Sequence, residues 1–299
     1  MPVCECKKII EIGLKVGDSK IFEEDKIWSK YSNDKVDIGE KTVGIIRKFH
    51  KSLPLKKKMF ALSIGSSNEP QFRILEAAFR GGLYLLDIEK AALDLITERV
   101  FRQKTAHVKT ILGDYCKVFF TISNASDFRR TTLDENRMNL VTLHHSLYYC
   151  IESEWMNIFK NLYTSVLADK GAIHAVLMAS ESEDGRSTTW LYNKFVNECF
   201  GGRNTQDMYR FKKYLLKEKI FKNSRIELEK SRVYFMPDDF GKFMAVVWMV
   251  LLYPEVHSYS LNQRERITEY MYKNFWAKKL PLTQTQDHLV IYRGIDLPD

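Results

Sequence analysis

The sequence predicts an α/β fold in which helices flank a mostly parallel sheet of the nucleotide-binding type. Short apolar runs at residues 59–64, 83–86 and 139–143 have the length and composition of buried parallel strands. Between them, residues 70–80 and 89–102 carry apolar side chains at helical spacing. Strands that alternate with helices in this way predict parallel pairing through right-handed crossovers.

The remaining strands follow from the same reasoning. Residues 172–178 form a fifth apolar run, residues 225–235 alternate as an edge strand does, and residues 288–292 predict the last strand. The third strand has two candidates, which are residues 108–112, followed by Asp114, and residues 118–122. The second candidate lies at the more usual short distance from the next strand, so we favour it.

Composition and charge narrow the function classes. The chain has 299 residues and a formal net charge of +8, which is compatible with nucleic acid or an acidic substrate as partner. Its basic residues are scattered among acids, a pattern that favours a solvated basic surface over a nucleic-acid site. No run approaches the roughly 20 apolar residues that cross a bilayer, so no membrane partner is expected.

The cysteines predict neither a disulfide framework nor a metal site. There are five of them, and the pair Cys4 and Cys6 has no second pair to complete a zinc site. A reducing compartment, the cytoplasm, is therefore the expected location.

The turn after the first strand carries the strongest functional signal. Gly65 ends that strand, and Asp87 ends the next one, about 20 residues later, where an acid accepts hydrogen bonds from ribose hydroxyls. A dinucleotide site requires three glycines in this turn (G-x-G-x-x-G), whereas residues 65–70 (GSSNEP) contain one glycine only. A pyrophosphate would be repelled by Glu69. An adenosine cofactor without phosphate, S-adenosylmethionine, suits the turn better.

These residues resemble the motifs of the class I S-adenosylmethionine-dependent methyltransferases. The matching pieces are residues 61–65 (ALSIG), 85–87 (LLD) and 139–149, and the resemblance extends over roughly residues 58–180. Among these enzymes the chain looks most like the small-molecule methyltransferases of the histamine N-methyltransferase group, which share a similar Leu-Ser-Ile-Gly strand and a Leu-Tyr-Tyr after strand four. The implied fold is a Rossmann-like sheet flanked by helices.

The resemblance also implies a division of the chain into four parts. They are an N-terminal helical extension (1–58), an S-adenosylmethionine-binding core (59–236), a helical insertion that acts as a lid (237–287), and the last core strand with a tail (288–299). A minimal core joins the edge strand to the last strand by a short hairpin, so the two intervening helices are an addition. Their aromatic residues are typical of a core, but they would also enclose a small acceptor.

The resemblance implies that the cofactor lies along the ends of the strands. Gly65 and Ser66 would face its methionine end, Asp87 its ribose, and His144 would lie against it. The adenine would meet a polar residue after the third strand, which is Asp114 on one candidate strand and Ser126 with Asp127 on the favoured one. The full implied set of cofactor-binding residues is Ser63, Gly65, Ser66, Ser67, Asp87, Ile88, Asp114, Ser126, Asp127 and His144.

Catalysis and acceptor binding are assigned to the segment after the fourth strand and to the insertion. Methyl transfer needs alignment above all, and a base only when the acceptor must lose a proton. His145 is the candidate base, since histidine titrates near neutral pH, and Tyr148 is the second candidate catalytic residue. A purely structural role, as two hydrogen-bonded histidines of a loop, is an equal alternative to the functional role for the pair His144-His145. Acceptor contacts are predicted for Tyr149, Trp248 and Trp276.

The predicted function is therefore methyl transfer from S-adenosylmethionine to a small-molecule amine or hydroxyl. One alternative is a methyltransferase that acts on RNA or protein, which the net charge would suit. Another is a catalytically silent binding protein, because Ser63, Ser67 and Glu69 stand where the family usually has an acid and glycines. An NAD-linked oxidoreductase is disfavoured by the single glycine of the turn.

Overall fold

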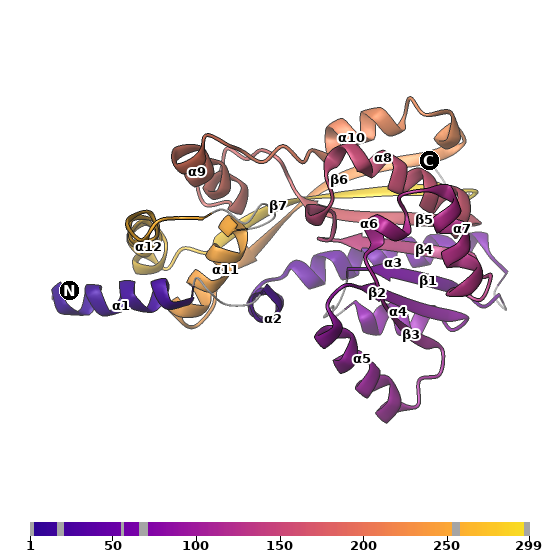
Figure 1. Cartoon of the computed structure of the whole chain (residues 1–299), viewed down its shortest axis with the longest axis horizontal. Helices are drawn as coiled ribbons and strands as arrows, with labels where there is room; N and C mark the ends of the chain where they lie inside the picture. The colour runs from indigo at the N-terminus through magenta and orange to yellow at the C-terminus, as the bar shows by residue number, and fades with distance from the viewer. Residues whose placement is uncertain (1–2, 17–20, 55–56, 66–70, 253–257, 296–299) are drawn as a thin grey trace. The chain divides into compact units, whose positions relative to one another are not determined.

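The computed structural model describes residues 3–16, 21–54, 57–65, 71–252 and 258–295 (Figure 1). Its centre is a seven-stranded sheet with the strand order β3-β2-β1-β4-β5-β7-β6. The pairs β1–β2, β2–β3, β1–β4 and β4–β5 are parallel, which confirms the predicted α/β class. The strands are β1 (Phe60–Ile64), β2 (Gly82–Asp87), β3 (Val108–Leu112), β4 (Met138–His144), β5 (Leu167–Met178), β6 (Ser224–Phe235) and β7 (Leu282–Arg293).

Helices connect the strands and precede the sheet. The longer helices are α1 (Val3–Lys15), α2 (Ile21–Tyr31), α3 (Asp34–Ser52), α5 (Lys90–Gln103), α7 (Ile122–Thr131), α8 (Glu152–Asn161), α9 (Thr188–Phe200), α11 (Phe240–Leu252) and α12 (Leu261–Asn274). Shorter ones are α4 (Phe72–Ala78), α6 (Tyr115–Val118), η2 (Leu147–Tyr149), η3 (Leu162–Val166), α10 (Met208–Leu215), η4 (Lys219–Phe221) and η5 (Trp276–Lys278).

The third strand corrects one prediction. It is β3, residues 108–112, and not the favoured residues 118–122, which hold the end of α6 and the start of α7. The hydroxyl of Thr121 accepts the backbone N–H of Asn124 at 3.2 Å and so begins α7 as its N-cap. Phe119 is fully buried in the core, which explains the apolar appearance of this segment. We expected a short connection between the third and fourth strands, but the connection between β3 and β4 is longer because it contains the helices α6 and α7.

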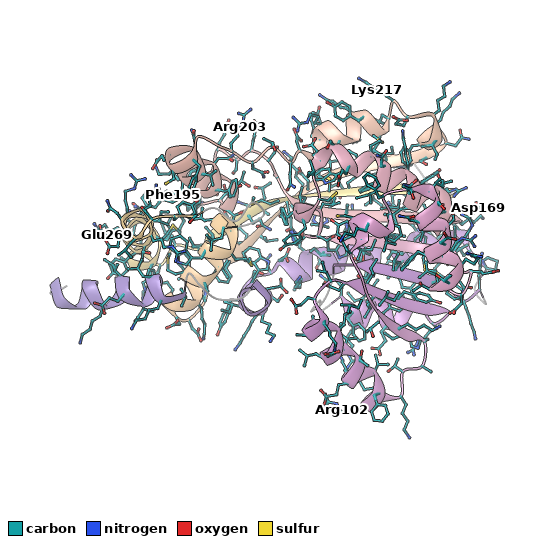
Figure 2. The ribbon with its side chains drawn as sticks, in the orientation of Figure 1. Arg102, Asp169, Phe195, Arg203, Lys217 and Glu269 are labelled. Carbon is teal, nitrogen blue, oxygen red and sulfur yellow. The ribbon has the colours of Figure 1, made fainter. Side chains whose placement is uncertain are left out.

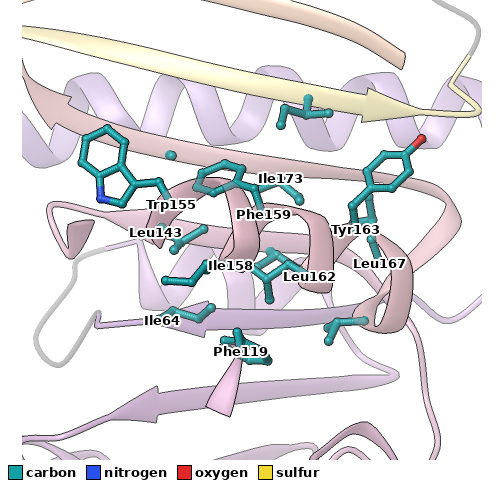
Figure 3. Close-up of a cluster of buried hydrophobic side chains, with 14 of the residues drawn as sticks. Ile64, Phe119, Leu143, Trp155, Ile158, Phe159, Leu162, Tyr163, Leu167 and Ile173 are labelled. Carbon is teal, nitrogen blue, oxygen red and sulfur yellow. The ribbon is translucent and has the colours of Figure 1, made fainter. Parts of the chain in front are cut away.

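One face of the sheet is apolar along β1, β2, β4 and β5. Its strand residues pack against α6, α7, α8 and α10, and Figure 3 shows Trp155, Ile158, Phe159 and Leu162 beside Ile64, Leu143 and Ile173. Because side chains alternate along a strand, every second residue contributes to this face. The strand residues concerned are Leu62, Ile64, Tyr84, Leu86, Val141, Leu143, Ile173, Ala175 and Leu177.

The opposite face changes character along the strands. Toward the start of β1 and β4 it holds Ala61 and Leu140, which pack with α3, α4 and α5. Toward the ends of the parallel strands the same face carries buried polar side chains. They are Ser63, Asp87, Thr142, His144, His174 and, from β7, His288.

The chain divides into two compact units. One unit is formed by residues 36–177, 207–230 and 287–299, and contains both packed faces just described. The other is formed by residues 1–35, 178–206 and 231–286. Its core is rich in aromatic side chains from α2, α9, β6 and α11, including Trp28, Phe195, Phe235, Phe243 and Trp248. We call the first the sheet unit and the second the aromatic unit.

The surface charges of the sheet unit are dispersed. Figure 2 shows Arg102, Asp169 and Lys217 pointing away from the ribbon on different elements. Many basic side chains pair with an acid close by in the chain, such as Lys90 with Asp94 at 2.6 Å. In the described part of the chain, no helix combines the length and the apolar character that a membrane span requires.

Candidate functional site

Gly65 marks the carboxyl end of β1 with a backbone conformation that other residues rarely adopt. Its φ is +67°, and its N–H donates to the carbonyl of Leu86 at 2.8 Å. A Cβ built here would lie 2.5 Å from the Cβ of Ser146. The glycine is therefore required both by its φ and by the close approach of the segment after β4.

Ser146 is a site residue that the sequence analysis missed. It is almost fully buried, and its Oγ has no hydrogen-bond partner among the described residues. Its carbonyl accepts the hydroxyl of Tyr115 at 2.9 Å, and burial strongly raises the pKa of that phenol. A buried hydroxyl without a partner costs free energy, so it points to a polar group that is yet to bind here.

Asp87 ends β2, the strand beside β1, as the sequence predicts. Its Oδ1 accepts the backbone N–H of Glu89 at 2.8 Å, which orients the carboxylate at the start of the following turn. Ile88, the next residue, is 72% exposed and so is accessible to a ligand. Gly65 and Asp87 therefore end adjacent parallel strands, where open α/β sheets bind their ligands.

Asp114 follows β3 and is the polar residue at the end of that strand. Its Oδ1 accepts the backbone N–H of Cys116 at 3.0 Å and caps α6. Ser126 and Asp127, which the favoured third strand placed at the adenine, lie instead on α7. Ser126 is 3.1 Å from the hydroxyl of Ser165, and Asp127 pairs with Arg130. Their assignment to the end of a strand is therefore wrong.

Ser63 and His144 lie in the interior of the sheet unit. Ser63 is fully buried, and its Oγ accepts the hydroxyl of Thr142 on β4 at 2.8 Å. A ligand therefore does not reach the Ser63 side chain in this structure. His144 is the last residue of β4 and is also buried, with its Nε2 3.0 Å from Nδ1 of His174.

His145 and Tyr148 form a stacked pair after β4. Their ring centroids are 6.0 Å apart with an interplanar angle of 8°, and Nδ1 of His145 is 3.3 Å from the Tyr148 hydroxyl. His145 has a φ of +53°, held by its N–H, which donates to the carbonyl of Val176 at 2.9 Å. Strained backbone of this kind gathers at functional sites. Tyr149 follows with 53% of its surface exposed.

Trp248 and Trp276, the two predicted acceptor contacts of the insertion, belong to the aromatic unit. Trp248 is completely buried on α11, and its indole N–H donates to the carbonyl of Gly13 at 2.9 Å. It is a core residue, and no acceptor reaches it in this structure. Trp276 is only partly buried and packs beside Phe240 and Phe243.

The sheet unit thus brings together six of the predicted residues at the carboxyl ends of β1 to β4. They are Gly65, Asp87, Ile88, Asp114, His144 and His145, with Tyr148 and Tyr149 one turn further on. The predicted cofactor contacts Ser66 and Ser67 lie outside the described residues. The sequence analysis missed Ser146, whose signal would have been its place in the strand-four motif directly after the two histidines.

Solved structures resemble this chain in fold. A putative methyltransferase from Bacillus halodurans matches 84% of this chain and 99% of its own, with a TM-score of 0.51 and 12% identity. The YcgJ protein from Bacillus subtilis matches 84% of this chain and 98% of its own, with a TM-score of 0.50 and 11% identity. No protein-family model and no curated protein sequence matches the chain. At these identities the likeness concerns the fold, and the chain has the Rossmann-like α/β fold found in methyltransferases.

Proposed function

We propose that this protein is an S-adenosylmethionine-dependent methyltransferase that acts on a small-molecule amine or hydroxyl. The observation that carries the proposal is the meeting of Gly65, Ser146 and Asp87 at the ends of three neighbouring strands. A left-handed glycine, a buried hydroxyl in need of a partner and an oriented carboxylate are the groups that an adenosine cofactor requires at this edge. The residues present therefore fit S-adenosylmethionine.

Each residue of the edge has a role in holding the cofactor. In our proposal Gly65 lets the cofactor approach the backbone, Asp87 accepts hydrogen bonds from the ribose, and Asp114 contacts the adenine. Ile88 offers an exposed apolar surface beside Asp87 for the adenine ring. We also propose that the protein is most similar to the histamine N-methyltransferase group, as its sequence suggests. Its proposed location is the cytoplasm.

The chemistry of the transfer divides between cofactor and protein. When bound, S-adenosylmethionine supplies a methyl group already activated by its sulfonium. The protein aligns the acceptor and removes its proton. We assign the proton transfer to the stacked pair of His145 and Tyr148, which follows β4 directly. Tyr149, half exposed beside them, would contact the acceptor.

Ligand-dependent thermal stability tests the cofactor. Each of S-adenosylmethionine, S-adenosylhomocysteine and NAD is added at about a hundredfold its expected Kd, where a ligand that binds only the folded state adds ~2.7 kcal/mol. We expect stabilisation by the first two and none by NAD. An absence of stabilisation by all three would favour a silent binding protein. Stabilisation by NAD alone would overturn the proposal.

A transfer assay then tests the acceptor class. Radioactive methyl groups from S-adenosylmethionine are followed into a panel of primary amines, phenols and alcohols, with total RNA and a protein mixture assayed in parallel. We expect labelled product from a small molecule. Label in RNA or protein with none in the small molecules would replace the acceptor part of the proposal and leave the cofactor part intact.

A further inference from the structure

Two cysteines that have no part in the proposed methyl transfer meet beside the strand ends. Cys116 lies on α6, in the connection from β3 to β4, and Cys150 directly follows η2, in the connection from β4 to β5. Sγ of Cys116 is 3.9 Å from the carbonyl oxygen of Tyr149, the residue bonded to Cys150. The two cysteine side chains hydrogen-bond to each other, and both are reduced thiols in the structure. The fold therefore brings two thiols from different connections into contact.

The two thiols differ in their access to solvent. Cys116 is partly exposed, whereas Cys150 is 3% exposed and belongs to the apolar core. Sγ of Cys150 lies 3.6 Å from Oε2 of Glu154 on α8. A dissolved oxidant therefore reaches the sulfur of Cys116 directly, and oxidises Cys150 only through Cys116.

The surroundings make Cys116 the more nucleophilic of the two thiols. The hydrogen bond with Cys150 lowers the pKa of Cys116, and a hydrogen bond with Tyr115 adds to this. Burial and the carboxylates of Asp114 and Glu154 oppose the lowering without cancelling it. The pKa of Cys150 is raised by the hydrogen bond with Cys116 and by burial. Because the thiolate is the reactive form, Cys116 is the sulfur that attacks an oxidant.

Hydrogen bonds of the main chain keep the two cysteines in place. The N–H of Cys116 donates to Oδ1 of Asp114 at 3.0 Å. The carbonyl of Cys150 accepts the indole N–H of Trp155, a completely buried side chain, at 3.1 Å. Since each backbone is anchored separately, the two sulfurs stay neighbours.

We propose that Cys116 and Cys150 are a peroxide-sensitive pair that closes to a reversible disulfide beside the strand ends. An accessible thiol next to a second, resolving thiol is the arrangement found in redox sensors, including those of reducing compartments. The disulfide goes beyond the proposed function and does not depend on it. Only its effect on turnover rests on the proposed methyl transfer.

With hydrogen peroxide as the oxidant, the disulfide forms in two balanced steps. The thiolate of Cys116 attacks one peroxide oxygen, the O–O bond breaks, and the leaving hydroxide takes up a proton to become water, which leaves Cys116 as a sulfenic acid. The sulfur of Cys150 then attacks the sulfur of Cys116, the S–O bond breaks, and the hydroxide leaves as water with the thiol proton of Cys150. Two thiols thus lose two protons and two electrons, and one peroxide becomes two waters.

The disulfide would change the edge of the sheet at which we propose that the cofactor binds. Bonded sulfurs lie ~2.05 Å apart, closer than hydrogen-bonded ones, so α6 and the end of η2 must move toward each other. Asp114, which accepts the N–H of Cys116, and Tyr149, which precedes Cys150, shift with them. A misplacement of about 1 Å costs roughly a hundredfold in rate, so turnover of the oxidised form should fall at least about tenfold.

Peptide mapping tests the disulfide without an acceptor. The whole protein is treated with hydrogen peroxide, alkylated and digested with trypsin, which releases Cys116 in residues 110–117 and Cys150 in residues 138–160. We expect these two peptides to be joined with the loss of two hydrogens, and to separate again in dithiothreitol. Cys199 is the reference, because burial raises the pKa of its thiol. Oxidation of Cys199 before the two peptides are joined would overturn the proposal.

Matched variants separate the roles of the two thiols. In Cys150→Ser the resolving sulfur is missing, so oxidation of Cys116 should stop at the sulfenic acid, which dimedone traps. In Cys116→Ser, a change at the partly exposed position, Cys150 should stay reduced even if Cys150→Ser fails to fold. Cys199→Ser, on α9 of the aromatic unit, should form the disulfide as the unaltered protein does. Oxidation of Cys150 in Cys116→Ser would overturn the assignment of the attacking thiol.

Turnover connects the pair to the site. With an acceptor found in the transfer assay, peroxide should lower kcat of the unaltered protein at least about tenfold, and dithiothreitol should restore it. Cys116→Ser should keep its kcat through the same treatment. An equal loss in Cys116→Ser would overturn the effect on turnover. Failure of the reduced protein to bind S-adenosylhomocysteine would instead overturn the proposed function, and the peptide map would stand apart from it.

Discussion

The two faces of the sheet differ at the ends of the parallel strands. On one face Ile64, Leu86 and Leu143 continue the apolar core to the last residues of β1, β2 and β4. On the other face the neighbouring positions hold Ser63 and His144, which hydrogen-bond to side chains on adjacent strands. If packing were the only requirement, both faces would carry apolar side chains at the ends of these strands. The polar side chains therefore distinguish this face at the edge of the sheet where we propose that the cofactor binds.

Asp287 and His288 show the same difference within one strand. They are consecutive in β7, so their side chains point to opposite faces. Nδ1 of His288 is 3.2 Å from Nε2 of His174, and its Nε2 is 2.9 Å from Oδ2 of Asp37. Asp287 points to the apolar face, where its Oδ1 lacks a hydrogen-bond partner among the described residues and burial raises its pKa to about 6. The two side chains therefore differ in their hydrogen bonding, since His288 has partners on its face and the Oδ1 of Asp287 has none among the described residues.

The largest effect is expected at the close approach of β1 and the segment after β4. Gly65→Ala combines a left-handed alanine with a 2.5 Å overlap, and should lower the free energy of unfolding by about 3 kcal/mol. Stabilisation by S-adenosylhomocysteine should disappear. Gly201→Ala is the matched control, because Gly201 has a φ of +70° with nothing within 4 Å. Equal losses in the two variants would mean that the overlap with Ser146 has no effect.

Exchanging polarity between the faces should give the next effect. Val141→Thr buries a hydroxyl on the apolar face and should cost about 2 kcal/mol. Thr142→Val, one residue on, removes the bond to Ser63 and should cost about 1 kcal/mol. Urea denaturation measures both. A larger loss for Thr142→Val than for Val141→Thr would contradict the distinction between the faces.

Asp87→Ala tests whether the end of β2 binds the ribose. Losing a hydrogen bond to a charged group should weaken S-adenosylhomocysteine binding by about 2 kcal/mol, or roughly thirtyfold in Kd, by titration calorimetry. The control is Asp134→Ala, which removes an acid that pairs with Lys109 away from the strand ends. If the affinity is the same for Asp87→Ala and the unaltered protein, the ribose assignment is wrong.

Asp287→Asn should stabilise the protein in a pH-dependent manner. The folded-state pKa of about 6 lies above the ordinary value of 3.8, so the folded protein binds this proton more tightly than the unfolded chain does. The stability that this tighter proton binding gives the folded protein is fully present below pH 3.8 and is lost as the pH rises through 6. The asparagine does not ionise, so relative to pH 4 the variant should gain about 1–2 kcal/mol at pH 8. A constant difference across this range would contradict the assignment.

The smallest effect is expected at the adenine. Asp114→Ala should weaken S-adenosylhomocysteine binding by about 1 kcal/mol, the value of an ordinary hydrogen bond. Asp127→Ala, at the position that sequence reasoning favoured, should leave binding unchanged because Asp127 lies on α7 and pairs with Arg130. A loss of affinity in Asp127→Ala alone would restore the earlier assignment.

The sequence predicts the sheet and much of its edge, but not the contacts of His174 with His144 and His288. The apolar runs locate β1, β2 and β4, and the residues that end them, Gly65 and Asp87, lie where predicted. The third strand was misjudged because Phe119 and its neighbours are buried in small helices, which gives them the apolar character of a strand. His174 and His288 are far apart in the chain, and only the order of the strands brings them together.

The division of the chain into two units limits how the protein can be cut. The chain passes from one unit to the other after residues 35, 177, 206, 230 and 286. Each unit is therefore assembled from three separate stretches, and no single fragment contains one whole unit without parts of the other. A fragment chosen to contain the whole sheet unit would also carry residues 178–206 and 231–286 of the aromatic unit. Reconstituting either unit by itself would require three separate peptides, so neither unit can be produced alone as one continuous chain without linkers in place of the excised stretches.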